Sequence, residues 1–303
     1  MTDKAPLVSV SLITYNQENF IAESIQSILD QDYPNLEIVI GDDCSQDATW
    51  EIISSFQTSH PTKIKAFRNP ENLGITGNAN EILKRCTGQF VAFTAGDDLF
   101  LPGKIRAQVE WFAEDERRVM CGHQVQVFYD GRSQSHQLTP VLTEGEGVRK
   151  IIEEGCPYGA VSVMVRRNRI PVSGFDDRSY YCAEYRLWIE CIGEDGIYGY
   201  VPGIYAKYRR HGNNITSQSE LVIADIERLL LGMLEDMPAM ADAIKTGLVN
   251  QVQVPRAREL MKSGSYLKGG LTLAGLYLMN PRRFFRAVVI RFYRYSGIGS
   301  KVA

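Results

Sequence analysis

Two hydrophobic periods alternate along the first 115 residues. Apolar residues occupy every second position in 7–13, and short apolar runs follow at 36–40, 64–67 and 90–94. Between these runs, apolar and small residues recur every three or four positions in 20–29, 52–56 and 76–86. A period of two predicts strands and a period of 3.6 predicts helices. Strands that alternate with helices predict right-handed crossovers and a parallel sheet.

The pattern is less regular beyond residue 115. Segments 119–129, 160–165 and 204–207 are strand-like, and a Gly- and Glu-rich stretch lies near 144–147, so we expect mixed sheet there. From residue 218 the pattern is helical almost throughout, with breaks expected at Pro238, Pro255, Gly269-Gly270 and Pro281. We therefore predict an α/β domain over 1–216 and a C-terminal helical region over 217–303.

Composition and charge narrow the class of protein. The 303 residues are 44% hydrophobic with a net charge of −3, which fits one large globular domain and gives no reason to expect nucleic-acid binding. The six cysteines form no C-x-x-C pair, so no zinc site or disulfide framework is predicted. The N-terminus lacks the layout of a signal peptide, and no apolar run approaches the roughly 20 residues of a spanning helix. We expect a cytoplasmic location.

Two pairs of acidic residues follow predicted strands. Asp42-Asp43 comes after the second strand and Asp97-Asp98 after the fourth. Open α/β sheets bind ligands beyond the carboxyl ends of their strands. Carboxylates there can accept a nucleobase N–H or a ribose hydroxyl, or bind Mg²⁺ or Mn²⁺ together with substrate phosphates. The structural alternative is turn and helix-cap chemistry, which we favour for Asp47.

Together with several other short fragments, these acidic pairs make the chain resemble the family 2 glycosyltransferases of the GT-A fold. The resemblance covers roughly residues 6 to 215 and rests on the order and spacing of short fragments that are weak singly. The fragments are Val8-Ser-Val-Ser-Leu-Ile-Thr-Tyr-Asn16, Ser27-Ile-Leu-Asp-Gln31, Glu37-Ile-Val-Ile-Gly-Asp-Asp43, Asn72-Leu-Gly74, Gly96-Asp-Asp98 and Leu101-Pro102. The resemblance implies a Rossmann-like nucleotide-binding mixed sheet flanked by helices. It also implies an inverting enzyme that moves a single sugar from a nucleoside-diphosphate donor, foremost a UDP-sugar, to a saccharide hydroxyl.

The resemblance also implies roles for individual residues. Asp97 is implied to bind Mn²⁺ or Mg²⁺, and Asp98 is implied to assist it through a water or by orienting it. Ala95 stands where the family's D-x-D motif has its first Asp, so one ribose or metal contact is missing from the pattern. The residues implied to lie at the base, the ribose or beside the nucleotide are Asp42, Asp43, Thr14, Asn16 and Glu18.

Two downstream segments supply a candidate base and a candidate leaving-group site. Glu184 precedes Leu187-Trp188 on a predicted helix and resembles the family's catalytic acid position, although Asp is more usual there. The alternative is a first-turn Glu favoured by the helix dipole. Arg209 and His211 resemble the family's Y-R-x-H segment near the diphosphate, and His211 is a candidate second metal ligand. Alone, that His would be interpreted as a surface residue.

Acceptor contact is expected in two segments, 157–160 and 174–177, whose glycines could instead serve turns. Residues 281–294 form an amphipathic basic helix in our prediction, with five arginines and no acid, suited to peripheral contact with the inner face of a membrane. The alternative is a packed terminal helix that supports an oligomer. Assembly of a bacterial surface polysaccharide on a lipid carrier would suit such an enzyme.

Two rival functions are considered. A nucleotidyltransferase is disfavoured because the first strand leads into Thr14-Tyr15-Asn16 and not into a Gly- and Lys-rich phosphate loop. A non-catalytic nucleotide-sugar-binding or scaffold protein stays open because the D-x-D motif is incomplete.

Overall fold

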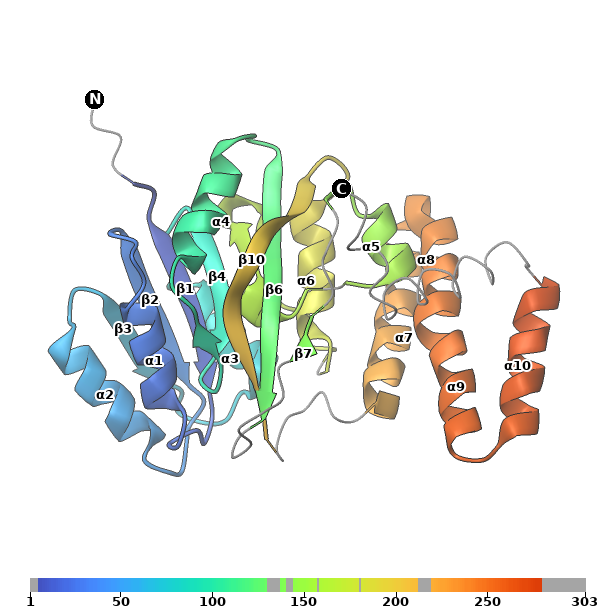
Figure 1. Ribbon diagram of the computed structural model, residues 1–303, viewed down its shortest axis with the longest axis horizontal. Coiled ribbons are helices and arrows are strands. Elements are labelled where there is room, and N and C mark those ends of the chain that lie inside the picture. The colour runs from blue at the N-terminus through green and yellow to red at the C-terminus, as the bar shows by residue number, and fades with distance from the viewer. Residues whose placement is uncertain are drawn as a thin grey trace.

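A computed structural model describes residues 5–129, 137–139, 144–156, 158–179, 181–211 and 219–279. Its first part alternates strands and helices as the hydrophobic periods predict (Figure 1). The elements are β1 (Val8–Thr14), α1 (Ile21–Leu29), β2 (Leu36–Asp42), α2 (Thr49–Ser59), β3 (Ile64–Arg68), α3 (Gly74–Leu83) and β4 (Phe90–Ala95).

One mixed sheet runs through the molecule in the order β3-β2-β1-β4-β9-β6-β10-β5. The first four strands are parallel, β9 is antiparallel to both β4 and β6, and β10 is parallel to β6. This mixed α/β architecture confirms the predicted fold class. The remaining strands are β5 (Leu99–Phe100), β6 (Arg118–Tyr129), β7 (Gln137–Leu138), β8 (Gly145–Glu146), β9 (Met164–Arg166) and β10 (Ile197–Arg210).

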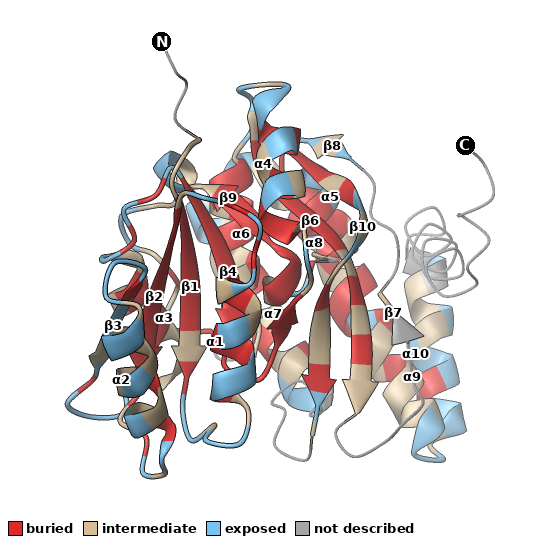
Figure 2. Cartoon of the chain, turned by 60° about the vertical axis from the view of Figure 1, so that its left-hand side comes forward, coloured by how far each residue is buried: buried red, intermediate tan, exposed pale blue. Residues whose placement is uncertain are grey.

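Helices cover both faces of the sheet. The even-numbered side chains Val8, Val10 and Leu12 of β1 pack with α1, α2 and α4 (Lys104–Ala113) in one buried cluster. A second cluster lies on the opposite face and includes Phe93 and Trp188, whose rings meet edge to face at 4.9 Å. It combines α3, α5 (Arg149–Glu154) and α6 (Ala183–Ile192). Figure 2 shows the central strands buried between the two layers.

Segment 160–165, which we predicted as a strand, is a strand only at its end. Ala160–Ser162 forms a 3₁₀ turn, and β9 begins at Met164. The Ser162 hydroxyl donates to the Gly159 carbonyl oxygen at 2.8 Å, and the Ser162 backbone N–H donates to the same oxygen at 2.9 Å. A side chain that bonds back to the preceding turn competes with strand pairing.

Within the C-terminal region, residues 219–279 are mostly helical, but two of the expected breaks are wrong. Pro238 does begin a new 3₁₀ turn after α7 (Ser219–Asp236). Helix continues through Pro255, where α8 (Ala241–Gly247), a π-helical turn (Leu248–Gln253) and α9 (Val254–Lys262) follow without interruption. Gly269 and Gly270 lie inside α10 (Tyr266–Met279), and the chain reverses earlier, at Gly264 with φ +86°. Pro281 lies outside the described residues.

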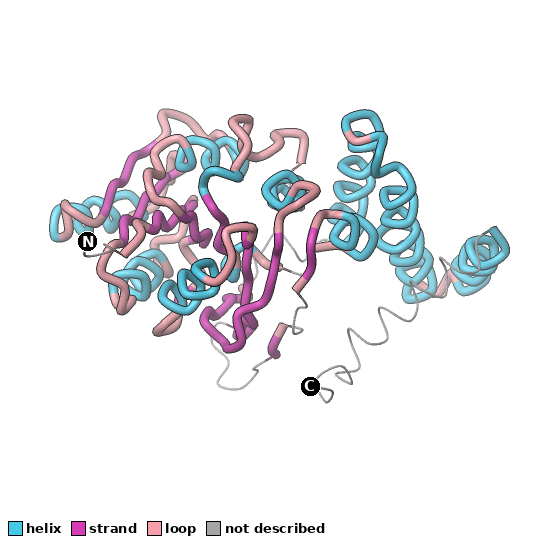
Figure 3. Tube along the Cα trace, turned by 90° about the horizontal axis from the view of Figure 1, so that it is seen from above, coloured by secondary structure: helices cyan, strands magenta, loops and turns pink. Residues whose placement is uncertain are grey.

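Helices α7 and α8 pack into the same hydrophobic core as α6. Ile223, Leu230 and Met233 of α7 and Ile244 of α8 belong to the same buried cluster as Trp188. Figure 3 shows α7 to α10 beside the sheet, with α10 farthest from it. Among the helices that the structure describes, none has both the length and the apolar character needed to cross a bilayer.

Candidate functional site

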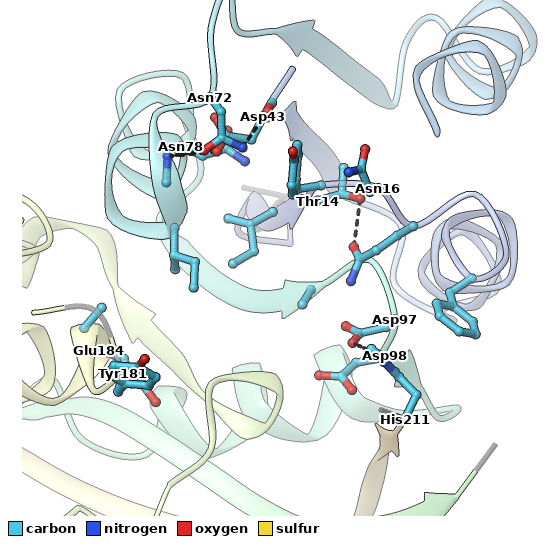
Figure 4. A pocket seen from close by; sticks show the side chains of 18 of the residues that line it. Thr14, Asn16, Asp43, Asn72, Asn78, Asp97, Asp98, Tyr181, Glu184 and His211 are labelled. Atoms are coloured by element: carbon cyan, nitrogen blue, oxygen red, sulfur yellow. Dashed lines mark hydrogen bonds and ion pairs between the residues drawn. The ribbon is translucent and has the colours of Figure 1, made fainter. Parts of the chain in front are cut away.

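A pocket of about 550 Å³ opens where the parallel strands end (Figure 4). The sheet register pairs Thr14 of β1 with Asp42 of β2, and Ile13 with Ala95 of β4. The residues that follow β2 and β4 therefore emerge on either side of β1. Asp43, Asp97 and Asp98 consequently lie in one pocket, although 54 or more residues separate the two pairs.

Hydrogen bonds join the loop after β1 (15–20) to the loop after β2 (43–48), and we call these two segments the locked loops. The Asn16 backbone N–H donates to the Ser45 hydroxyl at 2.9 Å, and the Gln46 N–H donates to Asn16 Oδ1 at 2.8 Å. Glu18 completes the lock, because its Oε2 accepts the Ala48 N–H at 2.9 Å. Asn16 has a φ of +50°, a left-handed conformation that Asn tolerates better than most residues.

Asp43 and Asn78 form the wall at the β2 side of the pocket. Asp43 Oδ1 accepts the Leu73 N–H, and Oδ2 accepts the Gly74 N–H, each at 2.9 Å, so the carboxylate fixes the start of α3. Asn78 Nδ2 donates to the Gly41 carbonyl at 2.8 Å. A carboxylate has about four acceptor positions, so Asp43 keeps capacity for a ligand N–H or hydroxyl.

Asp97 and His211 form the opposite wall. His211 Nε2 lies 2.9 Å from Asp97 Oδ2, and the His211 ring stacks on Phe20 with centroids 5.1 Å apart. Asp98 lies beside them and is buried; burial and the neighbouring Asp97 charge raise its pKa well above the ordinary Asp value. Asp98 Oδ1 accepts the Arg209 N–H at 3.1 Å.

The side chains fit part of a divalent-metal shell. A carboxylate oxygen and an imidazole nitrogen at 2.9 Å are both suitable ligands for Mn²⁺. Within the described residues, no group of three His, Cys, Asp or Glu side chains is placed to hold a metal alone. An ion bound there would take its other ligands from phosphate oxygens and water, as Mg²⁺ commonly does.

Close approach explains the glycine before Asp97. A Cβ on Gly96 would lie 2.5 Å from Gln17 Oε1 and 2.8 Å from Thr14 Oγ1. Real Cβ atoms do not approach so closely, so an alanine at this position would force the Gln17 and Thr14 side chains to move.

Glu184 lies at the N-terminal end of α6, on the side of the pocket that also carries Tyr181 (Figure 4). Burial raises the pKa of Glu184, and the negative charge of Asp225 adds to that increase. A carboxyl group with a raised pKa is a better proton acceptor than an ordinary surface Glu.

A second, mainly apolar pocket of about 410 Å³ adjoins the first. Glu184, Asp98 and Tyr208 line both pockets. Gly159 and Phe175, from the two segments for which we expected acceptor contact, line the second. Glu184 therefore stands where the two pockets meet.

Three residues expected at the nucleotide stand outside the lining of the first pocket. Asp42 is fully buried, and its carboxylate binds Ser45 and lies 3.2 Å from Arg68 Nε, because the last side chain of β2 points into the β2–α2 turn. Burial raises the pKa of Asp42. Glu18 instead holds the two locked loops together.

Arg209, the third of these residues, contacts the turn that carries Asp97 and Asp98 from outside the pocket lining. Its Nε donates to the Asp97 carbonyl at 3.0 Å, and its guanidinium lies between the Phe20 and Phe128 rings at 4.9 and 4.7 Å. Thr14, Asn16, Asp43, Asp97, Asp98, Glu184 and His211 do line the first pocket.

Sequence reasoning missed several polar lining residues, among them Asn78 and Tyr181. Asn78 follows Gly77 and precedes Ala79 and Ile82 on the buried side of α3. A polar residue on an apolar helix face was the available signal. Tyr181 gave none, because its place depends on how α6 begins.

Comparison with solved structures identifies the fold. TarS of S. aureus in complex with UDP-GlcNAc matches with a TM-score of 0.62 at 18% identity, over 95% of this chain and 81% of that one. The mannosyltransferase PcManGT of Pyrobaculum calidifontis, in complex with GDP-Man and Mn²⁺, matches with a TM-score of 0.58 at 18% identity, over 97% and 89%. At these identities the likeness concerns the fold, which is that of GT-A glycosyltransferases.

The family follows from sequence. The profile of "Glycosyl transferase family 2" matches residues 9–170, and the chain belongs to this family. EpsE of Bacillus subtilis, named a glycosyltransferase, is 29% identical over 201 residues, 65% of this chain and 70% of EpsE. WfgD of Escherichia coli, named a UDP-Glc:α-D-GlcNAc-diphosphoundecaprenol β-1,3-glucosyltransferase, is 27% identical over 212 residues, 70% and 80% of the two chains. The resemblance stated from the motifs is confirmed, and the protein is a glycosyltransferase.

Proposed function

We propose that this glycosyltransferase transfers a single sugar from a nucleoside-diphosphate donor, a UDP-sugar, to a saccharide hydroxyl, with inversion at the anomeric carbon. One observation carries the proposal: a single pocket gathers Asp43, the Asp97–His211 pair and Glu184. These are a hydrogen-bonding wall for a nucleoside, a partial metal shell for a diphosphate and a carboxyl group for proton transfer. The nucleotide sugars bound to TarS and PcManGT support the donor class.

The nucleoside end of the donor would lie between the locked loops and α3. Asp43 and Asn78 offer acceptor and amide groups there, while Thr14 and Asn16 border the space between them and the acidic turn. Asp42, Glu18 and Arg209 would act by holding these side chains in place.

The diphosphate would lie at Asp97 and His211. These two side chains would hold Mn²⁺ or Mg²⁺, and Asp98 would lie beside the ion. A bound cation would neutralise charge on the departing nucleoside diphosphate. The Mn²⁺ in the PcManGT complex supports this role.

Glu184 would accept the proton of the attacking hydroxyl. Glu184 lines both pockets, so it would lie beside a donor in the first and an acceptor in the second. Gly159 and Phe175 would then contact the acceptor. A positioned general base contributes about 10²- to 10⁴-fold to such a step.

The acceptor in our proposal is a lipid-linked saccharide of a bacterial surface polysaccharide. The printed name of WfgD, which includes a diphosphoundecaprenol-linked sugar, supports this setting. Leu267, Leu271 and Leu278 of α10 are 64–77% exposed and spaced along one helix face. Residues 281–303 follow with five arginines, one lysine and no acid. An apolar stripe next to basic sequence suits peripheral attachment to anionic lipid.

A thermal-shift panel of UDP-, GDP- and dTDP-sugars, with and without Mn²⁺, tests the donor and the metal, because a ligand that binds the native state raises its melting temperature. We expect one UDP-sugar to stabilise the protein, and to do so more strongly with Mn²⁺. Transfer to saccharide acceptors is then measured with that donor. Binding without hydrolysis or transfer over the whole panel would contradict catalysis and favour a scaffold.

A further inference from the structure

Helix α6 carries Glu184 but has no cap of its own. Its N-cap residue, Cys182, makes no side-chain capping hydrogen bond. The N–H groups at the start of a helix have no partner within the helix, so an uncapped start is usually frayed or held by groups from elsewhere. The segment that leads into α6 therefore needs an external acceptor if Glu184 is to be fixed.

Asp225 of α7 supplies that acceptor. Its Oδ2 accepts the backbone N–H of Tyr181 at 2.8 Å, the backbone N–H of Cys182 at 3.0 Å and the Ser179 hydroxyl at 2.8 Å. Its Oδ1 lies 3.2 Å from Arg228 Nη1, and Asp225 is only 2% exposed. Hydrogen bonds to a buried carboxylate are among the stronger ones in proteins.

A second contact holds α6 just beyond Glu184. Gln251, in the π-helical turn, donates through Nε2 to the Tyr185 hydroxyl at 3.0 Å and to the Ile152 carbonyl at 2.7 Å. The chain is thus tied to the C-terminal helices on both sides of Glu184, at Tyr181 and Cys182 just before α6 and at Tyr185 within it. Both α7 and the π-helical turn lie outside residues 9–170, which the family profile matches.

We propose that Asp225 is a positioning residue for Glu184: its carboxylate, from a different helix, holds the backbone N–H groups of Tyr181 and Cys182 just before α6 and so fixes the segment 181–184 at the pocket. The inference rests on the proposed role of Glu184 as the base. In this proposal α7 is required to position Glu184. The same carboxylate adds a negative charge near Glu184, while Arg228 offsets part of that charge and the Cys182 thiol lies beside both acids.

Hydrogen exchange on the full-length protein tests the positioning role without any substrate. In Asp225→Asn and Ser179→Ala, we expect the amides of residues 181–185 to exchange about tenfold faster or more, while the β1–β4 core keeps its protection. Glu220→Gln, which removes an exposed acid from the same helix, is the matched control and should exchange like the wild type. Wild-type protection of residues 181–185 in both variants would overturn the inference.

Turnover measurements separate a positioning role of Asp225 from an effect of its negative charge. With Mn²⁺ and UDP-glucose, UDP-galactose or UDP-N-acetylglucosamine, we expect both variants to lower kcat for UDP release about tenfold at an unchanged donor KM. Only Asp225→Asn removes charge, so only it should move the acid limb of the kcat profile to lower pH. Ser179→Ala, which keeps the charge, is expected to fold even if Asp225→Asn does not.

Glu184→Gln distinguishes the two possible failures. If this variant turns over as fast as the wild type, the proposed base is wrong. If it is inactive while Asp225→Asn and Ser179→Ala match the wild type in both turnover and exchange, the base stands and the positioning role of Asp225 is overturned.

Discussion

The imidazole Nε2 of His211 lies 2.9 Å from Asp97 Oδ2, across 114 positions of sequence. The contact joins the residue that follows β10 to the turn after β4, and these two strands are not neighbours in the sheet. Each side chain supplies a different kind of donor atom to one point of the pocket.

The first prediction concerns metal binding at this pair. Replacing His211 by Gln should weaken Mn²⁺ binding in the presence of UDP by roughly 10-fold or more, since even groups behind metal ligands affect affinity by that much. Isothermal titration with Mn²⁺ and UDP measures the change. His60→Gln, at the end of α2 and away from the pocket, serves as the control. Equal affinity in all three proteins would rule His211 out as a ligand.

The second prediction concerns the base. Glu184→Gln should lower kcat by roughly 10²- to 10⁴-fold and leave the thermal shift by donor unchanged. Because burial raises the pKa of Glu184, the ionised form that accepts a proton is lost at a higher pH than for an ordinary Glu. The wild-type kcat should therefore fall as the pH is lowered through this raised pKa. A kcat that stays constant down to pH ~4, near the ordinary Glu pKa, would contradict the assignment.

The third prediction concerns stability and pH at Glu37, a buried acid of β2. Burial raises the pKa of Glu37, but hydrogen bonds from Lys65, Ser9 and Thr87 outweigh burial and lower it to about 2. A lowered pKa stabilises the fold above the unfolded value and loses that effect as the pH falls from about 4.5 to about 2.

Glu37→Gln should consequently lower the free energy of unfolding by about 3 kcal/mol at pH 7 and by much less near pH 3. Urea unfolding at both pH values measures the difference. Glu81→Gln, which breaks exposed ion pairs on α3, should change stability by less than ~1 kcal/mol. A pH-independent loss in Glu37→Gln would show that its charge does not matter.

The fourth prediction concerns Gly96. Gly96→Ala should lower the free energy of unfolding by about 1–3 kcal/mol, because the new methyl group would meet Thr14 and Gln17. Gly232→Ala in α7 is the matched control: its methyl group has no neighbour within 4 Å, and it should stabilise the helix by about 0.5–1 kcal/mol. Melting temperatures that shift the same way in both variants would contradict this account.

The fifth prediction concerns the membrane. Changing Leu267, Leu271 and Leu278 together to Gln should reduce co-sedimentation with phosphatidylglycerol vesicles by about tenfold, as should deletion of residues 281–303. A control changes Leu221 and Leu231, which are exposed on α7, and should bind like the wild type. Unchanged binding by both the triple variant and the deletion would remove membrane attachment. A triple variant that binds fully beside a deletion that does not would assign attachment to the basic segment alone.

Periodicity in the sequence was sufficient to predict the parallel half of the fold, because each strand and helix there has one continuous apolar face. It failed at two places where individual contacts, one local and one between helices, override the apolar pattern. Ser162 bonds back to Gly159 and replaces a strand by a turn. Gly269, which we predicted as a break, instead lets α10 approach α9, where a Cβ would lie 2.6 Å from the Ala257 carbonyl oxygen.

The site was predictable in outline for a related reason. The residues that follow parallel strands lie at one edge of the sheet, so the acids after β2 and β4, the two neighbours of β1, were expected to lie close together. Which of two adjacent acids faces the pocket depends on how the strand ends, and Asp42 turns the other way. Asn78 and Tyr181 depend on helix placement, which no local pattern specifies.

The locked loops after β1 and β2 have a consequence for nucleobase selectivity in the proposed donor site. Backbone and side-chain hydrogen bonds join Asn16 to Ser45 and Gln46, and Glu18 to Ala48. In the proposed donor site, a nucleotide would meet two loops that are already joined, and its binding would cost little conformational entropy for ordering them. Preference among nucleobases should then follow from the fit of each base to a fixed surface, and a poorly fitting base cannot be rescued by loop movement.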